Sequence, residues 1–100
     1  MKLMNFKDHL KKRLDETEIK ELEKQAKIEY EALKLLQHDV AAAIAQHMEE
    51  HGMSFNELVR SLGISPTQGA KIKKGEANLT FASLAHIAGY LGKRPHIVFS

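Results

Sequence analysis

Cysteine is absent from this chain of 100 residues, and so is any apolar run of the roughly 18 residues that a membrane-spanning helix needs. Without cysteine, the chain has no disulfide framework and no thiolate metal or redox site. The first residues, MKLMNFKDHLKKR, also lack the apolar segment of a secretory signal peptide. We therefore expect a single globular domain in the cytoplasm, with no membrane association.

Glycine and proline are missing between Met1 and Gly52, so nothing in that half of the chain forces a helix to end. Apolar residues at helical spacing predict one helix over residues 17–36. A further helix is predicted over residues 39–51, with Asp39 as its N-cap. The sequence leaves open whether these two helices are continuous.

The stretch MSFNELVRSLGISPTQGAKIKKG predicts two short helices, over residues 54–62 and 66–74, joined by a tight turn. Ser54 is placed as the N-cap of the first helix and Gly63 stops it, whereas Gly75 ends the second. The residues expected to face inward are Leu58, Val59, Leu62 and Ile72. A glycine-containing turn between a short helix and a cationic second helix is the helix-turn-helix pattern, which places its second helix in a DNA groove.

The net charge is only +2, but it is unevenly distributed. Residues 1–39 hold nine basic and nine acidic residues and are neutral together. Residues 40–100 hold six basic and four acidic residues, and three of the six are Lys71, Lys73 and Lys74. A local cluster of lysines matters more for nucleic-acid binding than the total charge. The alternative interpretation of this small cluster is a solvated basic face.

Residues 79–91 predict another helix, with Thr80 as its N-cap and Gly92 as its stop. We expect Tyr90 at the edge of the core and His86 exposed on the polar side of this helix. The inward stripe consists of Leu84, Ile87, Ala88 and Leu91.

The tail changes its pattern after Pro95, where a β-rich segment consists of His96, Ile97, Val98 and Phe99. A lone strand of this length is unstable in water, so it must pair with something. Pairing with its own copy across a two-fold axis, or adding to a partner's sheet, would satisfy it. The alternative is an unpaired tail that packs on the helices. We predict a strand that contributes to a homodimer.

A zinc site and an enzyme active site are both disfavoured by the residues present. His47 and His51 stand one helical turn apart with Glu50 between them, but Met48 occupies the place where H-E-x-x-H requires glutamate. We interpret the pair as surface histidines. The chain has no nucleophile–base pair, no glycine-rich phosphate loop and no paired carboxylates, so we expect no catalysis, metal or cofactor.

Residues 1–36 precede the helix-turn-helix pattern and are too narrow to have a core of their own. Besides the helix already predicted there, apolar residues recur every four positions over residues 5–14 and predict a short amphipathic helix. One interpretation of this segment is a solvated helical surface with i,i+4 charge pairs. The other is an arm that docks a partner protein through Phe6, Leu10, Leu14, Leu22 and Tyr30.

Residues from about Asp39 to Leu91 resemble the Xre, or lambda-repressor/Cro-like, helix-turn-helix domain. The most specific likeness is KGEANLT followed by L..IA..LG. The matching residues are Leu58-Val59, Leu62-Gly63-Ile64-Ser65, Ile72, Lys74-Gly75-Glu76-Ala77-Asn78-Leu79-Thr80, Leu84, Ile87-Ala88 and Leu91-Gly92. The resemblance implies an all-α fold with a bundle of five helices that binds operator DNA.

The whole chain is also similar to a HigA-type antitoxin, with an arm over residues 1–36, an Xre domain over residues 37–92 and a strand within residues 93–100. That resemblance implies a repressor of its own operon that neutralises a small ribonuclease toxin of the RelE/HigB group. A HipB-like antitoxin, with a HipA-type partner and a dimer formed by the C-terminal strand, fits as well. The remaining alternative is a stand-alone or phage-type Xre regulator without a toxin.

Three positions depart from the family pattern. The family usually places glutamine first in both helices of the motif, where Phe55 and Pro66 stand here, and Gln68 is the candidate to take over base reading. Gly69 stands where the family usually has valine or isoleucine, and we expect a small void beneath it. The candidate DNA contacts are Ser54, Ser65, Thr67, Gln68, Lys71, Lys73, Lys74 and Asn78.

Overall fold

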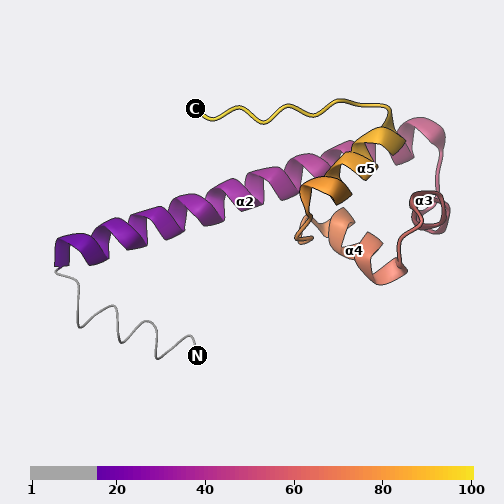
Figure 1. The fold of residues 1–100 in the computed structure, drawn as a ribbon. Helices are drawn as coiled ribbons and strands as arrows, with labels where there is room; N and C mark the ends of the chain where they lie inside the picture. The colour runs from indigo at the N-terminus through magenta and orange to yellow at the C-terminus, as the bar shows by residue number, and fades with distance from the viewer. Residues whose placement is uncertain (1–15) are drawn as a thin grey trace. The chain divides into compact units, whose positions relative to one another are not determined.

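A computed structural model describes residues 16–100, and in that part of the chain the fold is all-helical, with four helices and no strand (Figure 1). The helices are α2 (Glu16–His51), α3 (Phe55–Leu62), α4 (Pro66–Lys74) and α5 (Phe81–Leu91). The chain divides into two compact units between Leu33 and Lys34. The unit Lys34–Ser100 contains the helix-turn-helix and its core.

The two helices predicted over residues 17–36 and 39–51 form one helix, α2, so the predicted N-cap at Asp39 is wrong. This stretch contains no glycine or proline that would interrupt the backbone hydrogen bonds of a continuous helix. Aspartate inside a helix costs only about 0.7 kcal/mol relative to alanine, so Asp39 alone does not end it. The bundle of five helices is likewise not found in residues 16–100, where the count is four. The helix predicted over residues 5–14 lies outside the described residues.

The helix starts predicted at serine and threonine are confirmed. Ser54 Oγ accepts a hydrogen bond from the Glu57 N–H at 3.2 Å, which caps α3. Thr80 Oγ1 accepts from the Ser83 N–H at 3.1 Å and caps α5 in the same way. These side chains satisfy backbone donors that a helix start leaves without an intrahelical partner. The ends of the short helices are therefore determined locally.

The predicted glycine stops are also confirmed, and they share one geometry. At the end of α3, the Gly63 N–H donates to the Arg60 carbonyl and the Ile64 N–H donates to the Val59 carbonyl, both at 3.2 Å. Gly63 has a φ of +69°, a conformation that side chains with a Cβ rarely adopt. This double hydrogen bond turns the chain sharply between α3 and α4, which is what the motif requires.

The core of the second unit lies between the C-terminal part of α2 and the three shorter helices. Its fully buried members are Ile44 and Leu58. The remaining buried residues of the cluster are Leu62, Ile72, Ala77 and Ile87. The inward positions predicted for the motif are thus confirmed, because Leu58, Val59, Leu62 and Ile72 are all buried. Leu84 and Leu91 are half-buried, and Leu91 packs against this core.

The predicted strand in the tail is not found, because residues 93–100 carry no strand pairing. A strand needs hydrogen bonds from a neighbour, and the described residues contain no second strand to supply them. Val98 is 82% exposed and Phe99 is 95% exposed, so the tail does not pack these side chains on the helices either. Ile97 is less exposed, at 45%, and His96 is exposed.

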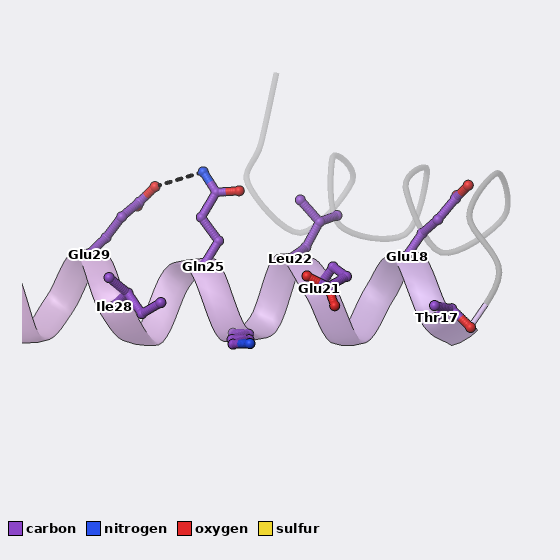
Figure 2. A pocket seen from close by; sticks show the side chains of 8 residues that line it. Thr17, Glu18, Glu21, Leu22, Gln25, Ile28 and Glu29 are labelled. Atoms are coloured by element: carbon purple, nitrogen blue, oxygen red, sulfur yellow. Dashed lines mark hydrogen bonds between the residues drawn. The ribbon is translucent and has the colours of Figure 1, made fainter.

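The first half of α2 carries apolar side chains at its surface. Figure 2 shows Leu22 and Ile28 among the polar residues of this stretch, beside a hydrogen bond from Gln25 Nε2 to Glu29 Oε1 of 3.2 Å. Of the residues predicted to contact a partner, Phe6, Leu10 and Leu14 lie outside the described residues, whereas Leu22 and Tyr30 are exposed. No helix within residues 16–100 is both long and apolar enough to cross a membrane.

Candidate nucleic-acid interface

The helix-turn-helix consists of α3, the turn at residues 63–65 and α4. Ser65 begins α4 by accepting a hydrogen bond from the Gln68 N–H at 3.1 Å, and Pro66 occupies the first helical turn. Proline costs little there because its missing N–H would have no intrahelical partner. The departure at Pro66 therefore suits a helix start. The positive end of the helix dipole at this start favours a negatively charged group in front of α4.

Gly69 is a point of close approach between the two helices of the motif. It is buried in the interior of α4, and a Cβ built on it would overlap Val59 Cγ1 and lie 3.4 Å from Phe55 Cε2 and Cζ. The prediction of a small void beneath Gly69 is therefore wrong. The Val59 side chain fills that space, so glycine allows α4 to pack directly against α3.

The outer surface of α4 carries the predicted contacts. With 3.6 residues per turn and with Gly69 and Ile72 buried, Thr67, Lys71 and Lys74 fall together on the side opposite the core. Gln68 and Lys73 are exposed as well, but they lie at the two borders of the buried side of α4. All eight predicted DNA contacts are exposed: Ser54, Ser65, Thr67, Gln68, Lys71, Lys73, Lys74 and Asn78.

Two of these eight residues already use their hydroxyl groups within the fold. Ser54 Oγ both accepts from the Glu57 N–H and donates to Glu57 Oε1, each at 3.2 Å. Ser65 Oγ accepts from the Gln68 N–H but keeps its own hydroxyl proton. Ser65 can therefore cap α4 and donate to a phosphate at the same time, whereas Ser54 is engaged on both sides.

Phe55, the other departure from the family pattern, is the first residue of α3, and its ring faces Lys73 of α4. Lys73 Nζ lies 5.7 Å from the centroid of the Phe55 ring, within the range of a cation–π interaction. At an exposed site such a contact stabilises by about 0.5–1 kcal/mol. Phe55 cannot offer a phosphate the hydrogen bond of a glutamine, but it restrains a lysine at the edge of the same surface.

Gln37 is a residue whose role sequence reasoning missed. It is buried on α2, and its Nε2 donates to the Ala77 carbonyl at 2.8 Å and to Asn78 Oδ1 at 3.4 Å. It thereby joins α2 to the loop that follows α4. Its place on the same helical stripe as Ala41 and Ile44 is a signal that could have found it, because a polar residue on a buried stripe requires a partner.

Two side chains of α5 and two histidines of α2 make further contacts in this unit. His86 Nε2 donates to the Leu62 carbonyl at 2.8 Å, so this exposed residue links α5 to the last turn of α3. The Tyr90 hydroxyl donates to Met53 Sδ at 3.4 Å, which agrees with a place at the edge of the core. The rings of His47 and His51 stack with centroids 4.2 Å apart.

Comparison with known proteins agrees with this geometry. Residues 43–96, just over half of the chain, match the Cro/C1-type HTH DNA-binding domain. No curated protein and no solved structure matches the chain. The fold and its exposed basic helix define a helix-turn-helix DNA-binding protein. The chain belongs to the Cro/C1-type HTH family and is a DNA-binding transcription regulator, so the resemblance to the Xre domain is confirmed at that level.

Proposed function

We propose that this regulator is a sequence-specific repressor that binds operator DNA as a homodimer. The observation that carries the proposal is the outer face of α4, where Thr67, Lys71 and Lys74 share one side and all are exposed. In this arrangement the start of α4 enters the major groove and the lysines contact the phosphates. Two such helices in a dimer would lie about 34 Å apart, one turn of B-DNA.

Base reading and phosphate binding are assigned to different residues on α4. Gln68 is exposed in the first turn, where a recognition helix meets base edges, and its amide can both donate and accept. Ser65 and Thr67 lie beside it and offer hydroxyl groups to flanking bases or phosphates. Lys71, Lys73 and Lys74 follow along the helix and supply charge without reading sequence.

Replacing Gln68 with alanine should change which base pair is preferred at one position of the operator. A bidentate contact with a base contributes about 1–3 kcal/mol of discrimination, so we expect the preference there to fall by about 5-fold or more. The measurement is selection of duplexes from a random-sequence library by the parent chain and by the Gln68→Ala variant.

Lys73→Ala is the matched control, because it should weaken binding to all selected duplexes alike. If the Gln68→Ala variant selects the same sequences as the parent with the same preferences, Gln68 does not read bases. If the parent selects no sequence at all, sequence-specific repression is wrong.

We further propose that the protein is the antitoxin of a type II toxin–antitoxin pair and represses its own operon. The match to the DNA-binding family begins at residue 43, and the first half of α2 lies before it, which supports a further role for that segment. Leu22 and Ile28 on that helix are 45% and 56% exposed, which supports contact with another protein. The partner would be a small toxin of the RelE/HigB or HipA type. The other candidate is a stand-alone Xre regulator, favoured if this surface has no partner.

The placement of the parts in this proposal follows from the boundaries expected above. Residues 1–36 would form the arm that covers the toxin, residues 37–92 the DNA-binding domain and residues 93–100 the dimer contact. The exposed tail residues Val98 and Phe99 support this last assignment, because a second copy would cover apolar side chains that the helices leave exposed.

A Leu22→Asp substitution should abolish toxin binding and leave DNA binding intact. Burying a leucine contributes about 1.5–3 kcal/mol, and an unpaired carboxylate in its place adds a desolvation cost, so we expect at least about 100-fold weaker binding. The measurement is co-purification with the product of a neighbouring gene that encodes a short basic protein.

Ala42→Asp, at an exposed position of the same helix, is the control and should retain the partner. Retention of the partner by both variants would contradict the assigned surface. The absence of any partner, together with no relief of toxicity when the two genes are co-expressed, would favour the stand-alone regulator.

A further inference from the structure

We propose that Gln37 is a positioning residue for DNA binding, which orients the Asn78 side chain so that its amide N–H groups face a phosphate. The proposal rests on the DNA-binding role of Asn78 given above. It starts from one geometric fact, which is that a buried amide on α2 contacts both the backbone before Asn78 and the side chain of Asn78.

The donor atom of Gln37 is identified by its two partners. Both the Ala77 carbonyl, at 2.8 Å, and Asn78 Oδ1, at 3.4 Å, are acceptors, so Nε2 must face them and Oε1 must face away. Reversing the amide would place two oxygens against each other. The longer of the two bonds therefore selects one orientation of the Asn78 amide, with its oxygen toward Gln37.

An asparagine amide has one acceptor, its oxygen, and one donor group, its nitrogen with two protons. When Oδ1 accepts from Gln37, Nδ2 is left to donate to another group, and Asn78 is exposed. Lys74 lies at the end of α4, before the turn that leads to Asn78. The donors of Asn78 thus continue the row of phosphate-binding groups from α4 into the following loop.

The arrangement leaves the side-chain oxygen of Gln37 without a hydrogen bond. Gln37 Oε1 is buried and has no hydrogen-bond partner among the described residues. A methionine of similar length would remove this unpaired oxygen but would leave the Ala77 carbonyl without its donor. The number of unpaired buried polar atoms would stay the same, so stability alone gives glutamine little advantage over methionine. The orientation of Asn78 is what glutamine provides and methionine does not.

The test is a cycle of Gln37→Met, Asn78→Ala and the double variant, with affinity for a short mixed-sequence DNA duplex measured at several salt concentrations. A hydrogen bond to a charged group contributes about 1.5–3 kcal/mol, which predicts at least about 10-fold weaker binding for Asn78→Ala. Gln37→Met should weaken binding by about 3- to 10-fold, because it frees the Asn78 amide to rotate. In the Asn78→Ala background, Gln37→Met should cause no further loss.

The salt dependence separates positioning from a general disturbance of the loop. Asn78 is neutral and releases no counterion, so neither substitution should change the slope of log affinity against log salt. A displaced loop would move Lys74 and lower the slope by about 0.9 for each lost phosphate contact. Gln46→Met is the matched control on the same helix, because Gln46 is exposed and donates only to Glu50, and it should bind as the parent does.

A second measurement uses the unmodified chain and does not depend on the variants folding. The side-chain amide resonances of Asn78 in ¹⁵N-labelled protein should shift when the duplex is added, while the Gln37 amide protons remain protected from exchange. Resonances of Asn78 that do not respond to the duplex would overturn the proposal. So would parent-like affinity of Gln37→Met, or a loss that persists in the Asn78→Ala background. A parent chain that does not bind the duplex would overturn the DNA-binding function itself, together with this inference.

Discussion

Replacing Lys71, Lys73 and Lys74 together with glutamine should reduce DNA affinity at physiological salt by about 1,000-fold or more, while the fold remains intact. All three side chains are exposed, and the hydrophobic core contains none of them. In a dimer the three lysines occur twice, so about six phosphate contacts are lost and the slope of log affinity against log salt falls by about 5. Titration of a duplex with the parent and the variant at several salt concentrations measures both quantities.

The control for this result is an equal loss of charge elsewhere in the chain. Lys20, Lys24 and Lys27 are exposed on the first half of α2, outside the residues that match the DNA-binding family. Replacing these three with glutamine changes the net charge by the same amount but removes no proposed phosphate contact. We expect a small decrease in affinity and an almost unchanged salt slope. Equal slopes for the two triple variants would mean that DNA is attracted by the overall charge and not by the surface of α4.

Gly69→Ala should destabilise the protein, although alanine is normally the better residue in a helix. Alanine gains about 1 kcal/mol of helix propensity over glycine, but the new Cβ overlaps Val59 Cγ1, and overpacking of this kind typically costs about 1–3 kcal/mol. Val59 is itself buried, so it has little room to move away. We expect a net loss of about 1 kcal/mol and a melting temperature lower by about 4–8 °C, measured by thermal and urea unfolding.

Two further variants identify the overlap as the cause. Gly89→Ala is the matched control, because Gly89 lies in α5 with no atom near the position of a new Cβ, and it should raise stability by about 1 kcal/mol. In a Val59→Ala background the space beneath Gly69 is open, so Gly69→Ala should cease to be destabilising. The coupling between the two sites should be about 0.5–3 kcal/mol. If Gly69→Ala stabilises the parent as much as Gly89→Ala does, the close contact between α3 and α4 is not tight.

The sequence by itself determined the parts of this protein that depend on near neighbours along the chain. Ser65 caps α4 because its hydroxyl lies three residues before the N–H that it accepts from, and Gly63 turns the chain because it can adopt a positive φ. The inward residues of the motif follow from helical periodicity. These local rules, with the KGEANLT segment, were sufficient to predict the helix-turn-helix and its family.

Only the tertiary structure decided which side chains support that motif. Gln37 and Ala77 are 40 residues apart, and His86 and Leu62 are 24 apart, so no local pattern pairs them. The close approach at Gly69 depends on the shape of Val59 across the helix pair, which helix propensity does not contain. The tail illustrates the same limit, because β-rich residues form a strand only where a second strand supplies hydrogen bonds. Local propensity sets what a segment can form, and the contacts made across the fold decide what it does form.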